Sequence, residues 1–494
     1  MYIDGVWLDN SGGDSTAHST AHSTDNSLGN STGNFPVFNP ATGEQIGSAL
    51  DNTPEQVESA IQAAARAFKS WSATTAYERS ACLYKAYQLM LEQKPQLAEL
   101  MTREQGKPLK AALNEVQYGA DFLLWYAEEA KRVYGESIPS ARKDQRFWVN
   151  QVPVGVVAAI TPWNYPISMI TRKVAPAIAA GCTMVLKPAE STPLCAIAMF
   201  KIFEQAGFPL GVLNLVTVAQ PAATGELFCT HPAVRKLTFT GSTPVGKHLA
   251  TLAAPHLKRV SMELGGHAPA VVFNDCDPVH AAKGLSLVKF LNTGQACISP
   301  NRIFVQRDVA EPFLAELTKR VKGMTAGNGM EPNVRIGPLI NQAAIDKVSA
   351  QVTDAIEKGA TLLCGGEPLT LDGMEKGHFY SPTVLSNITP EMRIYREETF
   401  GPVAPVIIFD SEEEVLEMAN DTHYGLAAYV YTENLSRSIR MYEGLNFGII
   451  GINDINPTSA AAPFGGMNSS GLGREGAKEG ILEYLETKLG GISV

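Results

Sequence analysis

Long hydrophobic runs, paired cysteines and an excess of basic residues are all missing from this chain of 494 residues. No apolar stretch reaches the roughly 18 residues that a membrane-spanning helix needs, so we expect no place in a membrane. The seven cysteines are scattered, odd in number and without a Cys-x-x-Cys pair, which argues against a zinc site and a disulfide framework. The net charge is −10 and no basic patch stands out, so nucleic acid is not an expected partner.

The remaining bulk properties indicate a folded, soluble protein. Hydrophobic residues make up 45% and charged residues 18% of the chain, and its length predicts about three domains. The N-terminus has neither the basic nor the apolar segment of a signal peptide. Together with the unpaired cysteines, this favours the reducing cytoplasm.

Residues 11–34 are rich in Ser, Thr, Asn and Gly. Such a composition cannot bury a core, so we expect a flexible insertion. Within it, His18 and His22 stand four apart, as two metal ligands on a helix would. No helix signal surrounds them, and we therefore expect no metal site.

Short apolar strands alternate with helical segments from residue 153 onward, which is typical of a doubly wound parallel sheet, an α/β fold. A similar alternation fills about 266–460. The expected strands are 156–160, 184–186, 213–216 and 236–240, and the expected helices are 167–180, 193–206, 223–230 and a segment from about 244.

The two ends of the chain follow other patterns. Thr53-Pro54 begins a helix with a capping box, and helical spacing continues over about 77–104 and 111–133. The tail 484–488 is predicted to be a strand without a local partner, and such a strand usually pairs with another chain or domain.

Cys297 and Glu263 are the residues most able to carry chemistry. Cys297 ends the segment Asn292–Cys297 and precedes an expected strand, while Glu263 follows a short apolar run. A thiolate can attack a carbonyl carbon, and a carboxylate can activate the water that releases the resulting thioester. With a hydride acceptor nearby, the two groups would suffice to oxidise an aldehyde to an acid.

Asn164 lies in a turn held by two prolines, Pro162 and Pro166, directly after an expected strand. A rigid turn can aim the Asn amide, which donates hydrogen bonds without titrating and suits an oxyanion. The alternative is a turn asparagine that bonds to its own backbone.

Three further segments could hold a dinucleotide. Glu190, near Lys187 at the end of a strand, could bind the ribose hydroxyls and would repel a 2′-phosphate, which favours NAD over NADP; a solvated ion pair is the alternative. Gly241 and Ser242 open a helix whose N-terminus could take a pyrophosphate, although such turns also occur without a ligand. Glu398 could contact the second ribose or lie in an exposed loop.

These segments, in this order, resemble the aldehyde dehydrogenase superfamily from Phe38-Asn39-Pro40 to the tail 484–488. The resemblance implies Cys297 as the nucleophile, Glu263 as the general base and Asn164 as the oxyanion donor, helped by the Cys297 backbone N–H. It implies an NAD cofactor, with NADP possible, bound by Thr161, Pro162, Trp163, Lys187, Glu190, Gly241, Ser242, Leu264, Glu398 and Phe400.

The resemblance also implies a domain organisation. We expect a Rossmann-like NAD-binding domain from 1–136 and 154–265, a catalytic α/β domain from 266–462, and a β-flap from 137–153 and 478–494. The flap would join subunits into a homodimer or homotetramer.

Within the superfamily the chain is closest to the succinate-semialdehyde dehydrogenase group, which holds its substrate carboxylate with two arginines and a hydroxyl. Arg172 matches the first arginine, although a structural ion pair is equally open, and Thr458 matches the hydroxyl. Leu291 occupies the second arginine position, and Phe464 is expected to contact substrate. Losing one arginine weakens anion binding by about 1–3 kcal/mol, so neutral aliphatic or aromatic aldehydes are an alternative substrate class.

Other functions fit less well. A CoA-acylating enzyme usually lacks the water-activating glutamate, whereas Glu263 is present. A cofactor-free cysteine hydrolase would need a histidine base, and no histidine motif accompanies Cys297. A non-catalytic structural member would be expected to have lost at least one of the reactive residues. Because position 299 is serine, we expect no redox-switch disulfide with Cys297.

Overall fold

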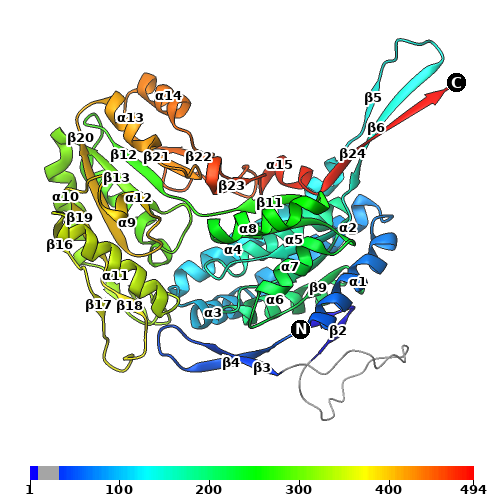
Figure 1. Cartoon of the computed structure of the whole chain (residues 1–494), viewed down its shortest axis with the longest axis horizontal. Coiled ribbons are helices and arrows are strands. Elements are labelled where there is room, and N and C mark those ends of the chain that lie inside the picture. Colours follow the sequence, from blue (N-terminus) through cyan, green and yellow to red (C-terminus); the bar gives the residue numbers. More distant parts are fainter. Residues whose placement is uncertain (9–32) are drawn as a thin grey trace.

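The computed structural model describes residues 1–8 and 33–494, in two lobes and a projecting ribbon (Figure 1). The predicted insertion at 11–34 and its two histidines lie almost wholly outside the described residues. At its end, Asn34 already begins β3 (Asn34–Phe38), which pairs with β4 (Gln45–Leu50).

An eight-stranded sheet forms the first lobe, and its five central strands run parallel. Its order is β2 (Val6–Trp7), β1 (Tyr2–Ile3), β9 (Leu213–Leu215), β8 (Thr183–Lys187), β7 (Val156–Ile160), β10 (Val234–Thr240), β11 (Arg259–Glu263) and β23 (Gly471–Leu472). The helices of this lobe are α1 (Pro54–Trp71), α2 (Ala76–Glu92), α3 (Lys94–Gln105), α4 (Leu109–Glu129), α5 (Ser168–Ala180), α6 (Pro193–Ala206), α7 (Ala222–Thr230), α8 (Thr243–Ala253) and α15 (Ala477–Leu482).

A seven-stranded sheet forms the second lobe. Its order is β16 (Thr361–Cys364), β19 (Thr383–Ser386), β20 (Val403–Phe409), β13 (Pro300–Gln306), β12 (Ala268–Val272), β21 (Ala427–Tyr431) and β22 (Ile449–Ile452). Around it lie α9 (Pro278–Phe290), α10 (Arg307–Lys322), α11 (Gln342–Glu357), α12 (Arg393–Arg396), α13 (Glu412–Asn420) and α14 (Leu435–Gly444), with the short pairs β14 (Thr325–Ala326) and β15 (Val334–Ile336), and β17 (Pro368–Leu369) and β18 (Phe379–Tyr380).

Helices cover both faces of the first sheet, as expected of a doubly wound fold (Figure 1). Along β7, Val157 and Ala159 enter one hydrophobic cluster, whereas Val156, Ala158 and Ile160 enter another on the opposite face. Side chains of a strand alternate between faces, so a strand buried on both faces becomes a continuous apolar run. This is why the sequence identified β7 and its neighbours.

One local prediction needs correction. The helical segment 77–104 is two helices, because α2 ends at Glu92 and α3 starts at Lys94, with Pro95 in its first turn. A proline is favoured in a first turn and removes a hydrogen bond inside a helix, which agrees with the break just before Pro95. The tail is a strand without a partner nearby in sequence, as predicted. This strand, β24 (Leu485–Ser493), pairs antiparallel with β6 (Gln145–Pro153), which also pairs with β5 (Glu136–Ile138) in the projecting ribbon.

Candidate active site

The carboxyl ends of the parallel strands in the first lobe create a ligand-binding crevice. β7 lies between β8 and β10, and the chain continues through β8 and β9 on one side and β10 and β11 on the other. The strand order therefore reverses between β7 and β10. In open α/β sheets, ligands bind outside the carboxyl ends of the strands at this reversal.

The residues predicted to hold the dinucleotide gather at this edge. Lys187 is the last residue of β8, and three residues directly follow a strand: Thr161 follows β7, Gly241 follows β10 and Leu264 follows β11. The hydroxyl oxygens of Thr161 and Thr240 are buried and have no hydrogen-bond partner among residues 1–8 and 33–494. Buried hydroxyls are normally bonded, so these two are suited to contact a polar ligand.

The N-terminus of α8 is open toward the same edge. Ser242 is its N-cap residue, but the Ser242 side chain makes no capping hydrogen bond. The first backbone N–H groups of a helix then remain available to an anion such as a pyrophosphate. Leu264 packs against α8 at Gly246, where an added Cβ would lie 2.3 Å from Leu264 Cδ2. Glycine thus permits this close packing of the helix on β11.

Lys187 and Glu190 form an ion pair across the end of β8, with the lysine buried and the glutamate about one-third exposed. The pair that the sequence left as an alternative to ribose binding is therefore present. It does not conflict with that role, because a carboxylate has two oxygens and can accept more than one hydrogen bond.

Glu398 and Phe400 approach the crevice from the second lobe. Glu398 Oε1 accepts a hydrogen bond from the Gly266 N–H at 2.9 Å, and burial raises the pKa of Glu398 to about 7. The Phe400 ring meets Trp163 edge-on with centroids 5.5 Å apart. Glu398 is thus bonded to the crevice wall, in contrast to the exposed loop that was its alternative.

The turn before the nucleophile has an unusual backbone. Asn292, Thr293 and Gly294 all have left-handed φ values, 50°, 59° and 75°. This conformation is uncommon for residues with a side chain and rare for a β-branched threonine. It persists because the surroundings hold it: the Thr293 hydroxyl donates to the Gly337 carbonyl, and the Gln295 amide donates to the Pro338 carbonyl. Strained turns of this kind occur often at functional sites.

A cavity of about 340 Å³ opens beside this turn and contains Cys297. The same cavity is lined by Arg172, Leu291, Thr458 and Phe464, which are all of the residues predicted to contact substrate. Asn164 lies behind the wall, where its amide nitrogen donates to the Gln295 carbonyl at 3.0 Å. The structure therefore brings Asn164 against the turn that carries the nucleophile.

Burial disfavours the charged form of both reactive groups. Burial raises the pKa of the Cys297 thiol to about 12; nearby Arg172 opposes the shift and Glu263 adds to it. Burial and the neighbouring Glu475 also raise the pKa of Glu263 well above its ordinary value. A charged Glu263 thus disfavours ionisation of Cys297, since two nearby negative charges repel. The sequence left the activation of the thiol open, and this environment does not activate it.

Arg172 forms the structural ion pair that was one of its two predicted roles, while its role as a substrate anchor stays a prediction. Its Nε lies 2.8 Å from Glu475 Oε2 in a buried ion pair, and its guanidinium stacks over the Phe464 ring at 4.0 Å. Its Nη2 is buried and has no hydrogen-bond partner within the described part of the chain. Glu475 therefore holds the guanidinium by charge, while Nη2 on the same edge keeps no hydrogen-bond partner there, and Arg172 lines the cavity.

Several residues of the site were missed from sequence. Glu475 binds both Arg172 and Lys173, with 2.6 Å to Lys173 Nζ. Lys107 and Glu115 form a buried ion pair in the cavity wall. Charged residues are exposed by default, and no local pattern distinguishes these from surface residues. The only available signal was Gly106-Lys107-Pro108, a short break between two helical segments.

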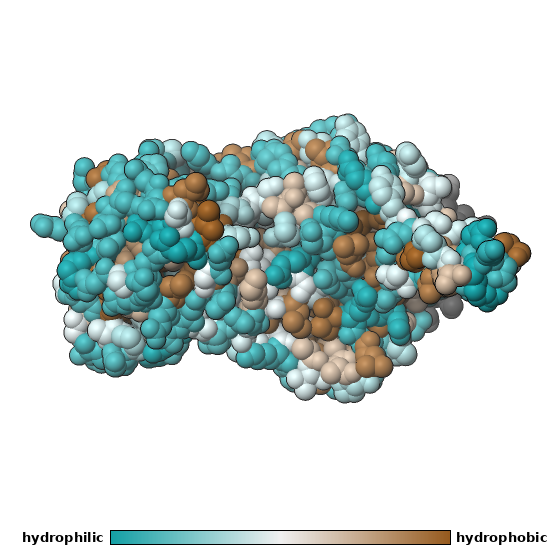
Figure 2. Space-filling model, turned by 90° about the horizontal axis from the view of Figure 1, so that it is seen from above, coloured by the Kyte–Doolittle hydropathy of each residue, from teal (hydrophilic) through white to brown (hydrophobic). Residues whose placement is uncertain are grey.

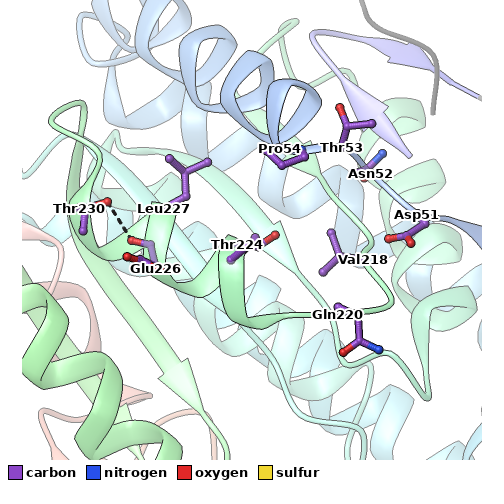
Figure 3. Close-up of a pocket in the computed structure, with 11 residues that line it drawn as sticks. Asp51, Asn52, Thr53, Pro54, Val218, Gln220, Thr224, Glu226, Leu227 and Thr230 are labelled. Carbon is purple, nitrogen blue, oxygen red and sulfur yellow. Dashed lines mark hydrogen bonds between the residues drawn. The ribbon is translucent and has the colours of Figure 1, made fainter. Parts of the chain in front are cut away.

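A second cavity, of about 470 Å³, lies between the start of α1 and one side of α7 (Figure 3). Thr53 and Pro54 face it from α1, and Thr224 and Leu227 face it from α7. It contains neither a cysteine nor any other predicted site residue, so the chemistry belongs to the Cys297 cavity. Within the described ranges no cluster of His, Cys, Asp or Glu could hold a metal ion, and no helix is long and apolar enough to cross a membrane.

Comparison with known proteins identifies relatives over nearly the whole chain. The family model described as "Aldehyde dehydrogenase family" matches residues 28–489. The chain is 47% identical to a 3-sulfolactaldehyde dehydrogenase of Pseudomonas putida, covering 99% of this chain and 97% of that one. It is 49% identical to a probable succinate-semialdehyde dehydrogenase [NADP(+)] of Sinorhizobium fredii, covering 92% of each.

Solved structures agree with these matches. An NADP-dependent enzyme of E. coli superposes with a TM-score of 0.93 at 44% identity, over 100% of this chain and 98% of that one. A betaine aldehyde dehydrogenase of Staphylococcus aureus, in complex with NAD+, also gives 0.93, at 35% identity over 100% and 94%. These likenesses confirm the α/β fold predicted from sequence and the resemblance on which the predicted roles depend.

Proposed function

This chain belongs to the aldehyde dehydrogenase family, and on that premise we propose that it oxidises an aldehyde with a distal acidic group, of the succinate-semialdehyde type, to the carboxylic acid. The observation that carries the proposal is the buried cation Arg172 in the lining of the cavity that contains Cys297, with its Nη2 lacking a hydrogen-bond partner among the described residues. A buried guanidinium nitrogen without a partner is costly unless a ligand supplies an anion.

The proposed reaction uses three residues in order. Cys297 first loses its thiol proton to water, and the thiolate attacks the aldehyde carbon. The resulting oxyanion receives a hydrogen bond from the Asn164 amide; one such donor is worth about 3 kcal/mol. When bound, NAD(P)+ would accept a hydride from the thiohemiacetal carbon. Loss of this hydride leaves a thioester on Cys297. Glu263 then takes a proton from water, which attacks the thioester and releases the acid and the free thiol.

Neutral aldehydes are the alternative substrate class, and Leu291 favours them. It lines the cavity at the position expected for a second arginine, and Phe464 adds another apolar wall. We still prefer the acidic aldehyde, because Arg172 places a buried positive charge in the cavity wall, and an acidic group on the substrate would balance it. A CoA-acylating or structural member is disfavoured, because Cys297 and Glu263 both remain and interact electrostatically.

A matched pair of substrates tests this proposal. We expect kcat/KM for succinate semialdehyde to exceed that for butanal, which has the same length without the carboxylate, by about 10-fold or more. Leu291→Arg should raise kcat/KM for succinate semialdehyde by about a further 10-fold and leave butanal unchanged or slower, since it adds one charge-assisted bond. Initial rates of NADH or NADPH formation give both ratios. A parent enzyme that prefers butanal would favour the neutral class.

We propose that Glu190 selects NAD over NADP. Its carboxylate lies at the end of β8, where the ribose is expected, and would repel a 2′-phosphate. We expect kcat/KM with NAD to exceed that with NADP by about 10-fold, and Glu190→Gln to shrink this ratio because it leaves Lys187 free for the phosphate. Lys187→Met is the control, which should weaken both cofactors. An NADP preference in the parent enzyme would refute this role.

We also propose that the lobes and ribbon are the predicted domains: an NAD-binding domain from 1–136 and 154–265, a catalytic domain from 266–462, and an oligomerisation flap from 137–153 and 478–494. In the flap, Ile138, Phe147, Val149 and Leu489 share one face by strand register, and Ile138 and Leu489 are exposed. Elsewhere, apolar residues form separate patches among polar ones (Figure 2). An exposed apolar sheet face of this kind supports assembly into a homodimer or homotetramer.

The location of the protein is a separate proposal. Its seven cysteines are all free, which supports the reducing cytoplasm.

A further inference from the structure

Lys107 and Glu115 form a fully buried ion pair that the reaction above does not use. Each side chain is only 1% exposed, and both line the cavity of Cys297. A buried ion pair is weak evidence for stability, because desolvation of the two charges offsets their attraction. Its position in the wall of a reactive cavity therefore calls for another explanation.

The pair is bonded mainly to the segment that carries Asn164. Lys107 Nζ donates to the Asn164 carbonyl at 2.8 Å. Glu115 Oε1 accepts the backbone N–H groups of Ile167, at 3.0 Å, and Ser168, at 3.2 Å. The two charges thus hold both ends of the stretch 164–168, at the entrance to α5.

Lys107 has no capacity left for a substrate. Its ammonium contacts Glu115, donates to the Asn164 carbonyl and lies 4.1 Å above the centre of the Tyr165 ring. An ammonium has three N–H donors, and these contacts account for them. Lys107 therefore cannot replace the arginine that is missing at Leu291, although it lines the same cavity.

The nucleophile turn reaches the same carbonyl from the other side. Asn292 Nδ2 donates to the Asn164 carbonyl at 2.9 Å, and Asn164 Nδ2 donates to the Gln295 carbonyl at 3.0 Å. Asn164 is thereby fixed at its backbone by Lys107 and Asn292 and at its side chain by Gln295. An amide placed in this way needs little reorganisation when an oxyanion forms, which is the condition for strong electrostatic stabilisation.

We propose that Lys107 and Glu115 are a positioning pair that aims the Asn164 amide at the developing oxyanion. This inference rests on the proposed function, since it assigns the pair a role through Asn164. Neither residue touches the reacting atoms; they act by holding the 164–168 segment against the turn of Cys297.

A double-mutant cycle with Asn164 tests the proposal. Lys107→Met together with Glu115→Gln removes the bond to the Asn164 carbonyl, yet the Gln oxygen still accepts from Ile167 and Ser168. We expect kcat to fall about 10- to 100-fold with KM within about 3-fold of the parent, because the lost interaction matters only in the transition state. Asn164→Ala alone should cost about 100- to 1,000-fold.

The decisive comparison is the combined variant. If the pair acts through Asn164, adding K107M/E115Q to N164A should lower kcat by no more than about 3-fold, since residues acting as one unit are not additive. A purely structural pair would slow both backgrounds equally and would overturn the proposal. So would a K107M/E115Q enzyme with parental kcat. If N164A itself keeps parental kcat, the oxyanion assignment fails instead, and with it this part of the proposed function.

Two further variants keep the result interpretable. Arg437→Met breaks a partly buried set of ion pairs with Glu412 and Asp275 in the second lobe. It should lower the melting temperature without lowering kcat, which separates lost stability from lost positioning. If K107M/E115Q does not fold, K107Q/E115Q retains a polar side chain in the wall and should give the same cycle; additive losses there would overturn the proposal equally.

Discussion

Cys297→Ala abolishes aldehyde-dependent reduction of NAD(P)+, with a loss in kcat of at least about 10⁴-fold, the scale seen when a covalent nucleophile is removed. Binding of NAD(P)+ should persist, because the predicted cofactor contacts come from other residues at the carboxyl edge of the first sheet. Steady-state rates measure the loss, and fluorescence titration with NADH measures the binding.

Cys276→Ala is the matched control for this result. Cys276 is also half-buried, and burial raises the pKa of its thiol to about 11, but its sulfur donates to the Phe273 carbonyl and lies outside the Cys297 cavity. This variant should keep parental kcat. Turnover by Cys297→Ala within about 10-fold of the parent would end the assignment of Cys297 as nucleophile.

The parts of this site that the sequence predicted all depend on local signals. Thr161, Lys187, Gly241 and Leu264 each lie at or directly after the end of a parallel strand, and the carboxyl ends of such strands meet at one edge. Strand prediction placed Lys187 and Gly241 at this edge, whereas Thr161 and Leu264 were assigned through the resemblance to the family. Cys297 was marked by its resemblance to a family, and the structure adds the left-handed turn that presents it.

The parts that the sequence did not predict are contacts across long separations. Glu475 binds Lys173 across 302 residues, and Lys107 binds the Asn164 carbonyl across 57. These charges are buried only because tertiary packing encloses them, and composition gives no sign of it. The pairing of the tail with residues 145–153 was anticipated only through the resemblance, since strand register between distant segments is set by the whole fold.

Glu263→Gln should divide the reaction into a fast and a slow half. If Glu263 activates the water that cleaves the thioester, the first turnover proceeds and the second stalls. We expect a burst of about one NADH per active site, followed by a steady rate about 10³-fold below the parent, the usual range for loss of a general base. Stopped-flow absorbance resolves both phases. A steady rate equal to the parent's would contradict the assignment, and a slow rate without a burst would move Glu263 to activation of the thiol.

The same substitution has an expected effect on stability, with a sign set by the raised pKa of Glu263. Between the unfolded value, about 4.3, and the raised folded value, the native state binds more protons than the unfolded state. The free energy of unfolding contributed by this group is therefore lost as pH rises through that window. The neutral amide in Glu263→Gln mimics the protonated carboxyl, so the variant should melt above the parent at pH 8, with the difference shrinking toward pH 5.

Glu104→Gln is the matched control for the kinetic result. Glu104 is also a buried glutamate, and burial raises its pKa to about 7, but the variant should keep parental kcat. A burst confined to Glu263→Gln would thus trace to its place beside Cys297 and not to the loss of any buried acid.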